Sequence, residues 1–247
     1  MDYSKVYLSF MDRIRLAYRK KGFFYVLGAF VRNPWIYYVK PFLLSIYWKV
    51  KGKPTFIFLG SEHRQFSHWY NSTYQNERAV EIPIARHFLK KFKKGRTLEI
   101  GHVLSHYQRQ DWDVVDKYEK VSGVLSEDIA TWVPAEPYDC VFSISTIEHV
   151  GWDENSKKPE MLRDAFENII SNILSFNGIF LFTVPVGWNA YLDEMVKTNS
   201  LPAGQYFGLR RDGAGWKECS LEGALRLPYD ESIPSARAVI VGIISKK

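Results

Sequence analysis

Short apolar runs alternate with amphipathic segments along most of this chain. The runs are rich in branched and aromatic residues and end at glycine or polar positions, a pattern typical of buried strands. They lie at residues 53–60, 97–101, 112–116, 121–125, 138–144, 179–184 and 236–244. Strands that alternate with helical patterns favour a mostly parallel sheet with helices on its faces. We therefore expect an α/β fold.

Two segments between these runs predict helices. Residues 77–92 and 161–174 carry apolar side chains three or four positions apart, which gives each a single apolar face. Pro83 suits the first turn of the first helix, where its missing N–H does no harm. Asn177 and Gly178 suit the end of the second helix. Residues 186–215 show neither period, and we expect irregular structure there.

The first 53 residues differ from the rest in charge and in aromatic content. They hold eleven Lys and Arg against two Asp, so they carry +9 of a chain whose net charge is +6. Residues 1–21 show helical spacing of apolar residues, and aromatic runs follow until Trp48. The chain thus divides into a basic, aromatic, amphipathic helical segment at residues 1–53 and a domain at residues 54–247.

Two interpretations of residues 1–53 stay open. Aromatic rings interleaved with Lys and Arg suit an anionic membrane surface, whereas the same rings could cap the domain. A transmembrane helix needs about 20 apolar residues, and charges and prolines interrupt every run here. The pattern of a signal peptide does not fit well. The runs are also too apolar for a nucleic-acid surface.

The remaining composition describes an ordinary globular domain. The chain has 247 residues and is 46% hydrophobic, enough for one α/β domain with an appendage. Cys140 and Cys219 match no metal-binding spacing. We expect Cys140 to be a buried thiol, because it lies within an apolar run.

Polar residues follow the predicted strands where a ligand would bind. Gly101 ends the run in RTLEIGHVLSHY, where a tight turn or a close ligand approach requires glycine. Asp116, Asp128 and the pair Glu148–His149 each follow a later run. The carboxyl ends of parallel strands meet at one sheet edge, so we expect these side chains to surround one site.

This order resembles the class I S-adenosylmethionine (SAM)-dependent methyltransferases. The resemblance covers residues from about 55 to the C-terminus. EIGHVLSHY, VDKYE, SISTIEHVGWDE and YNSTYQNERAVEIP look like a subset of methyltransferases associated with surface-glycan or lipid-linked saccharide biosynthesis. The resemblance implies a Rossmann-like fold with a mostly parallel seven-stranded sheet. His102-Val103-Leu104 departs from the family, because most members have a glycine-rich loop there.

The resemblance also implies roles for individual residues. The methyl donor SAM would be bound by Glu99, Gly101, His102, Asp116, Lys117, Asp128 and Ser145. The acceptor would be bound by Tyr107, Asp153, Trp188 and Asn189, with His149 and Glu148 as catalytic residues. Trp188 and Trp216 could stack on a sugar ring or lie in the core. His149 would be the base for a hydroxyl acceptor, but for a carboxylate acceptor it would only orient the substrate.

We therefore expect an enzyme that O-methylates a saccharide or lipid-linked glycan, cytoplasmic and possibly peripheral at the inner membrane face. No nucleic acid is expected as a partner. His102 and His106 are four positions apart, but no third ligand is apparent, so no metal is expected. One alternative is a catalytically silent, membrane-docked partner of a glycan-assembly enzyme. Another, an NAD-dependent oxidoreductase, would need a glycine-rich turn that the chain lacks.

Overall fold

A computed structural model of the protein describes residues 28, 39–68, 70–154, 156–213, 215–229 and 235–247. The helix expected at residues 1–21 lies outside the described residues. Of the basic segment, the structure describes mainly α3 (Lys40–Lys51). No helix in the described part of the chain combines the length and the apolar character needed to cross a bilayer.

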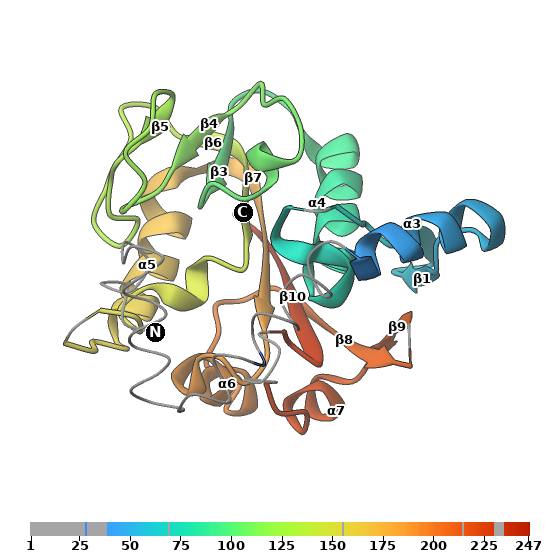
Figure 1. Ribbon diagram of the computed structural model, residues 1–247. Coiled ribbons are helices and arrows are strands. Elements are labelled where there is room, and N and C mark those ends of the chain that lie inside the picture. Colours follow the sequence, from blue (N-terminus) through green and yellow to red (C-terminus); the bar gives the residue numbers. More distant parts are fainter. Residues whose placement is uncertain (1–27, 29–38, 69, 155, 214, 230–234) are drawn as a thin grey trace.

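A mixed eight-stranded sheet forms the centre of the protein (Figure 1), in the order β5-β4-β3-β6-β7-β10-β8-β9. Its strands are β3 (Thr97–Ile100), β4 (Asp113–Val115), β5 (Val124–Leu125), β6 (Tyr138–Ile144), β7 (Leu174–Pro185), β8 (Gln205–Asp212), β9 (Gly215–Cys219) and β10 (Ala238–Ser245). The strands from β5 to β7 are parallel, and β10 is antiparallel to both of its neighbours. This confirms the Rossmann-like fold, with β9 as an eighth strand beyond the seven expected.

The strand order reverses between β3 and β6. From β3 the chain continues outward through β4 and β5, and it then returns to β6 on the other side of β3. The loops after β3 and β6 therefore diverge at the carboxyl edge of the sheet. Such a switch point is where open α/β sheets bind ligands.

Helices cover both faces of the sheet, and the apolar stripes that predicted them are buried. On one face, α4 (Arg78–Phe92) packs Ile84 and Phe88 into a cluster with Phe142 of β6. On the other face, α5 (Met161–Asn168) packs Phe166 against Phe182, with ring centroids 5.1 Å apart. Cys140 is buried as a free thiol, as expected.

The prediction for Pro83 is wrong in position. The helix begins at Arg78, so Pro83 lies inside α4 and leaves the carbonyl of Ala79 without its helical N–H partner. The backbone N–H of Phe66 donates to that carbonyl at 2.8 Å. The proline is tolerated because another segment supplies the missing hydrogen bond.

The second helix ends within one residue of the expected position, but Asn177 and Gly178 do not end it. A single wider turn, Ile169–Ile173, follows α5, and β7 already begins at Leu174. Asn177 and Gly178 therefore lie within a strand, at an irregularity where the pairing with β6 shifts register. Asn177 has a φ of 63°, which its short polar side chain tolerates. The Asn177-Gly178 pair therefore corresponds to this irregularity in the strand and not to the end of the helix.

Residues 186–215 differ from the expectation of irregular structure. Residues 186–215 contain α6 (Ala190–Lys197) and β8. The strand expected near residue 55 is present as β1 (Thr55–Phe58), but it pairs with β2 (Ser61–Arg64) in a separate hairpin. A short helix, α7 (Leu221–Leu225), precedes the final strand.

Candidate functional site

A pocket that is partly open to solvent lies at the carboxyl ends of β3, β4, β5 and β6. Its wall consists of Ile100, Gly101, Val115, Asp116, Lys117, Tyr118, Glu127, Asp128, Ile129, Thr146, His149, Val150 and Glu154. Five residues predicted from the sequence are among them: Gly101, Asp116, Lys117, Asp128 and His149. The strand order that brings them together is the switch-point arrangement described above.

Gly101 is required by its backbone conformation and by a neighbouring side chain. Its φ is 83°, and a Cβ at this position would lie 2.1 Å from Oγ1 of Thr146. A larger residue would therefore separate the loop after β3 from the loop after β6. The glycine brings the two loops of the switch point into contact.

Glu99 holds the turn that follows Gly101. Its buried carboxylate accepts hydrogen bonds from the backbone N–H groups of Val103 at 2.9 Å and Leu104 at 2.5 Å. The Ser105 hydroxyl and the Trp112 indole donate to its second oxygen at 2.5 and 2.9 Å. These four hydrogen bonds hold the conformation of the turn, which has no glycine-rich sequence after Gly101. Glu99 thus shapes the turn from beneath and does not line the pocket.

Asp116 joins the pocket wall at the end of β4. Its Oδ1 accepts from the backbone N–H groups of Tyr118 and Glu119, at 2.8 and 2.9 Å. These bonds fix the direction of the carboxylate and leave Oδ2 as the oxygen available to a ligand. A carboxylate held in this way can accept hydrogen bonds from neighbouring hydroxyl groups.

Lys117 links three segments of the wall. Its Nζ lies 2.9 Å from Oδ2 of Asp128 and 2.5 Å from Oε1 of Glu154. Burial lowers the pKa of Lys117, but the hydrogen bonds with Glu154 and Asp128 outweigh burial and raise it overall. The lysine therefore remains charged and neutralises the two acids across one side of the pocket.

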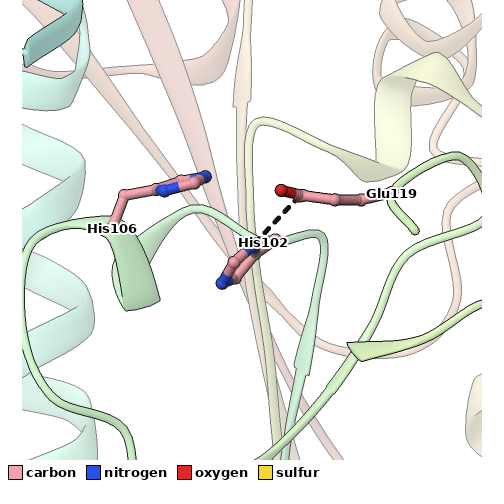
Figure 2. A group of neighbouring side chains, drawn as sticks. All are labelled: His102, His106 and Glu119. Atoms are coloured by element: carbon pink, nitrogen blue, oxygen red, sulfur yellow. Dashed lines mark ion pairs between the residues drawn. The ribbon is translucent and has the colours of Figure 1, made fainter. Parts of the chain in front are cut away.

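His102, by contrast, lies outside the pocket wall. Figure 2 shows it with His106 and Glu119, and one ligand atom from each lies within 4.8 Å of the others. Nδ1 of His102 is 2.9 Å from Oε2 of Glu119, although the pair is not aligned as a hydrogen bond. The sequence offered no third ligand, and the structure supplies Glu119. These three side chains could hold a divalent cation.

His149 and Asp153 form a pair beside the pocket. Nδ1 of His149 is hydrogen-bonded to Oδ2 of Asp153, whose side chain is buried. Because an ionised carboxylate only accepts, Nδ1 carries the proton and Nε2 is the nitrogen that can take up another. Burial lowers the pKa of His149, but the hydrogen bond to Asp153 and the charge of Glu148 outweigh burial and raise it above the usual 6.5. The pair has the arrangement of a general base and its orienting acid.

A cluster of buried charges lies behind His149. Arg78, at the start of α4, donates from Nη1 to Oε2 of Glu81 at 2.5 Å. The other oxygen of Glu81 accepts from the hydroxyl of Ser145 at 2.7 Å. Oε1 of Glu148 lies 3.7 Å from Nε2 of His149. Arg78 and Glu81 were not predicted as site residues, although both lie in the motif at residues 70–83.

Aromatic side chains stand beside the histidine. The ring of Trp188 is 5.5 Å from the ring of His149 and 5.1 Å from that of Tyr229. Asn189 holds the same loop: its amide donates to the Glu148 carbonyl at 2.7 Å, and its oxygen caps α6. Tyr107 packs against Phe66 and Tyr70. Trp216 is buried in the core, which rules out its stacking on a sugar.

A scan against protein-family models found no match, and neither did a search of curated protein sequences. A search of solved structures found chains of similar fold. The N-methyltransferase NodS from Bradyrhizobium japonicum WM9, in complex with S-adenosyl-L-homocysteine, is 14% identical with a TM-score of 0.44, over 69% of this chain and 87% of that chain. The sugar N-methyltransferase KedS8 from Streptoalloteichus is 11% identical with a TM-score of 0.36, over 77% and 99%. The glycopeptide N-methyltransferase MtfA, in complex with SAM, is 13% identical with a TM-score of 0.35, over 70% and 91%.

Proposed function

We propose that this protein is a SAM-dependent methyltransferase that methylates a hydroxyl group of a saccharide. The observation that carries the proposal is the place of His149. It belongs to the wall of the switch-point pocket, and it is also bonded to Asp153 as a general base would be. His149 thus lines the proposed nucleoside site and also has the hydrogen bond expected of a general base.

The pocket wall fits the adenosyl part of SAM. Asp116 presents one oxygen to the pocket, where it would accept from the ribose hydroxyls. Asp128 and Ile129 lie where the adenine edge and face would be contacted. SAM, when bound, supplies an electrophilic methyl group on a sulfonium. Gly101 and Thr146, which are in close contact, would lie beneath the methionine part of the bound donor.

His149 would remove the proton of the acceptor. As the hydroxyl oxygen bonds to the methyl carbon and the carbon–sulfur bond breaks, Nε2 takes the hydroxyl proton and the sulfur keeps the bonding electron pair. Asp153 holds the ring and stabilises the resulting imidazolium. A carboxylate acceptor would need no base. The site therefore favours a neutral hydroxyl acceptor.

A saccharide acceptor fits the aromatic side chains beside the base. The ring centroid of Trp188 lies 5.5 Å from that of His149, and Tyr229 packs against Trp188 at 5.1 Å. Asn189 fixes the loop that carries Trp188. The subset of methyltransferases that the sequence motifs resemble supports a surface-glycan or lipid-linked saccharide.

The described part of the basic segment supports a membrane-bound location. One face of α3 exposes apolar side chains, among them Phe42, 63% exposed, and Val50, 78% exposed. The opposite face, with Leu44 and Trp48, faces a groove beside β1 and β9. Figure 1 shows α3 at the periphery of the protein. The net charge of residues 1–53 suits anionic headgroups, so we propose that α3 docks the enzyme on an anionic membrane near a lipid-linked acceptor.

The test is methyl transfer to a panel of nucleotide sugars and lipid-linked oligosaccharides, using SAM with a radiolabelled methyl group. We expect label in at least one saccharide, with an equal amount of S-adenosylhomocysteine. Binding of SAM without transfer to any saccharide would contradict the proposal. That result would favour a silent partner of a glycan-assembly enzyme, which is the second candidate.

A further inference from the structure

Glu148 is a buried acid whose carboxyl group has no hydrogen-bond partner among the described residues. Its side chain is 1% exposed, and both carboxyl oxygens are unpartnered. Its own backbone N–H is near but is not aligned as a hydrogen bond. Nε of Arg78 is likewise buried and unpartnered within the described residues. Buried polar groups in folded proteins are nearly always paired, so two such groups in one cluster require an explanation.

The position of the cluster suggests a ligand. Thr146 and His149, in the loop after β6, line the switch-point pocket. Ser145 and Glu148, in the same loop, belong to the charge cluster instead. His149 belongs to both, since its Nε2 is 3.7 Å from Oε1 of Glu148. Glu148 and Arg78 therefore lie next to His149, which borders the pocket, and they are the nearest charged groups to which a longer ligand could extend on that side.

The two unpartnered groups differ in charge: Arg78 is a cation, and the carboxyl group of Glu148 becomes an anion when it loses its proton. The guanidinium of Arg78 donates from Nη1 to Glu81 and retains other N–H groups, in a planar fork that suits a carboxylate. A carboxylate such as Glu148 suits an ammonium group. A ligand that satisfies both is a zwitterion, and the methionine end of SAM carries both an α-carboxylate and an α-ammonium group.

The turn after β3 gives an independent reason for this assignment. In a glycine-rich turn, backbone N–H groups face a ligand and can bind its carboxylate. Here the N–H groups of Val103 and Leu104 both donate to Glu99 instead. They are not available to a donor molecule. Other groups of this chain must then hold the charged end of the donor.

We propose that Arg78 binds the α-carboxylate of the methyl donor and that Glu148 binds its α-ammonium group. The assignment rests on the proposed function and extends it to two residues. Glu81 and Ser145 position the guanidinium through their hydrogen bonds. Arg78 lies on α4, outside the loops of the sheet edge, so the helix before β3 would take part in donor binding.

The test compares ligands that differ only at the charged end. Calorimetry would measure S-adenosylhomocysteine, its decarboxylated form, which keeps the amine, and 5′-methylthioadenosine, which lacks both groups. The variants are Arg78→Met and Glu148→Gln. Arg86→Met is the matched control, because Arg86 lies on the same helix and bonds to Gln108 at 2.8 Å.

We expect Arg78→Met to weaken the binding of S-adenosylhomocysteine by about 10- to 100-fold, the loss typical of a charged hydrogen bond. The dissociation constants of the other two ligands should stay within about twofold of the wild-type values. Glu148→Gln should weaken the binding of both ligands that carry the amine and leave the binding of 5′-methylthioadenosine unchanged. Arg86→Met should change none of them. Retained binding of 5′-methylthioadenosine also shows that each variant is folded.

Two results would overturn the assignment alone. The first is unchanged binding of S-adenosylhomocysteine to Arg78→Met and Glu148→Gln. The second is an equal loss for all three ligands, which would mean that Arg78 and Glu148 only support the fold. If the wild-type chain bound none of the three ligands, the proposed function itself would be wrong, and the assignment with it.

Discussion

Nδ1 of His149 is hydrogen-bonded to the buried carboxylate of Asp153, four residues later in the same loop. This contact fixes the ring so that Nε2 is the nitrogen able to accept a proton. Because His149 also lines the switch-point pocket, the proton acceptor lies beside the proposed methyl donor. Donor binding and proton removal can therefore be separated by mutation.

Replacing His149 tests its role as the base. His149→Ala should bind S-adenosylhomocysteine as the wild type does, because the adenosyl contacts come from Asp116 and Asp128. Its turnover should fall by about 10²- to 10⁴-fold, the usual contribution of a general base. His87→Ala is the control, since His87 packs against His63, away from the pocket. Full activity of His149→Ala would remove this residue from the mechanism.

The pair with Asp153 predicts a pH dependence. His149 acts as a base only when neutral, so the rate should rise with pH through its pKa, which the Asp153 bond holds above 6.5. Asp153→Asn removes the negative charge, and the rising limb of the pH–rate profile should move to lower pH. The measurement is the pH dependence of kcat in both proteins. Identical profiles would show that Asp153 does not set the protonation of His149.

Asp116 should determine donor affinity through its charge. Asp116→Asn keeps an oxygen for the N–H groups of Tyr118 and Glu119, so the turn should persist. Loss of the charged hydrogen-bond acceptor should weaken the binding of S-adenosylhomocysteine by about 10- to 100-fold. Asp164→Asn, on the exposed side of α5, is the control for the same chemical change. Wild-type affinity in Asp116→Asn would contradict the ribose assignment.

Glu148 should make the unliganded protein less stable at high pH. Burial raises its pKa from 4.5 to about 8, with the charge of His149 opposing the rise. Between these values the unfolded state releases a proton that the native state keeps, so the free energy of unfolding falls as pH rises.

Glu148→Gln should therefore increase stability at pH 8 by up to roughly 4 kcal/mol and have little effect at pH 4.5. Urea unfolding at the two pH values measures the difference. The same effect of the substitution at both pH values would show that the carboxyl group is not the cause.

The apolar face of α3 should mediate membrane binding. Ile46→Glu combined with Phe42→Glu places two charges on the exposed face, and the protein should be released from vesicles that contain anionic lipid. Deletion of residues 1–53 should have the same effect. Phe176→Glu is the matched control, because this phenylalanine is also exposed but lies on β7. If the intact protein never co-floats with anionic vesicles, the membrane proposal is wrong.

The sequence predicted the residues that depend on strand order. Asp116, Asp128 and His149 each follow a buried strand, and parallel strands bring their carboxyl ends to one edge. Gly101 was predicted because a tight turn or a close ligand approach after the strand requires glycine. However, its Cβ would meet Thr146, which the sequence could not show.

The residues that were missed depend on contacts between distant segments. Arg78 and Glu81 lie in the first turns of a helix, where charged residues usually face solvent, and only the packing of α4 against β6 buries them. Glu119 is 17 positions from His102, and their proximity depends on the path of the loop after β4. The role of Glu99 likewise depends on a folded turn, since its four partners have no common sequence pattern.

The most direct test of the central claim is calorimetric binding of SAM and S-adenosylhomocysteine to the purified protein, with NAD as the control. We predict micromolar dissociation constants for the first two ligands, about −8 kcal/mol each, and no binding of NAD. That result would establish that the protein binds the methyl donor, for which the pocket at the ends of β3, β4, β5 and β6 is the proposed site. Binding of NAD alone, or of none of the three, would contradict the assignment of this protein as a methyltransferase.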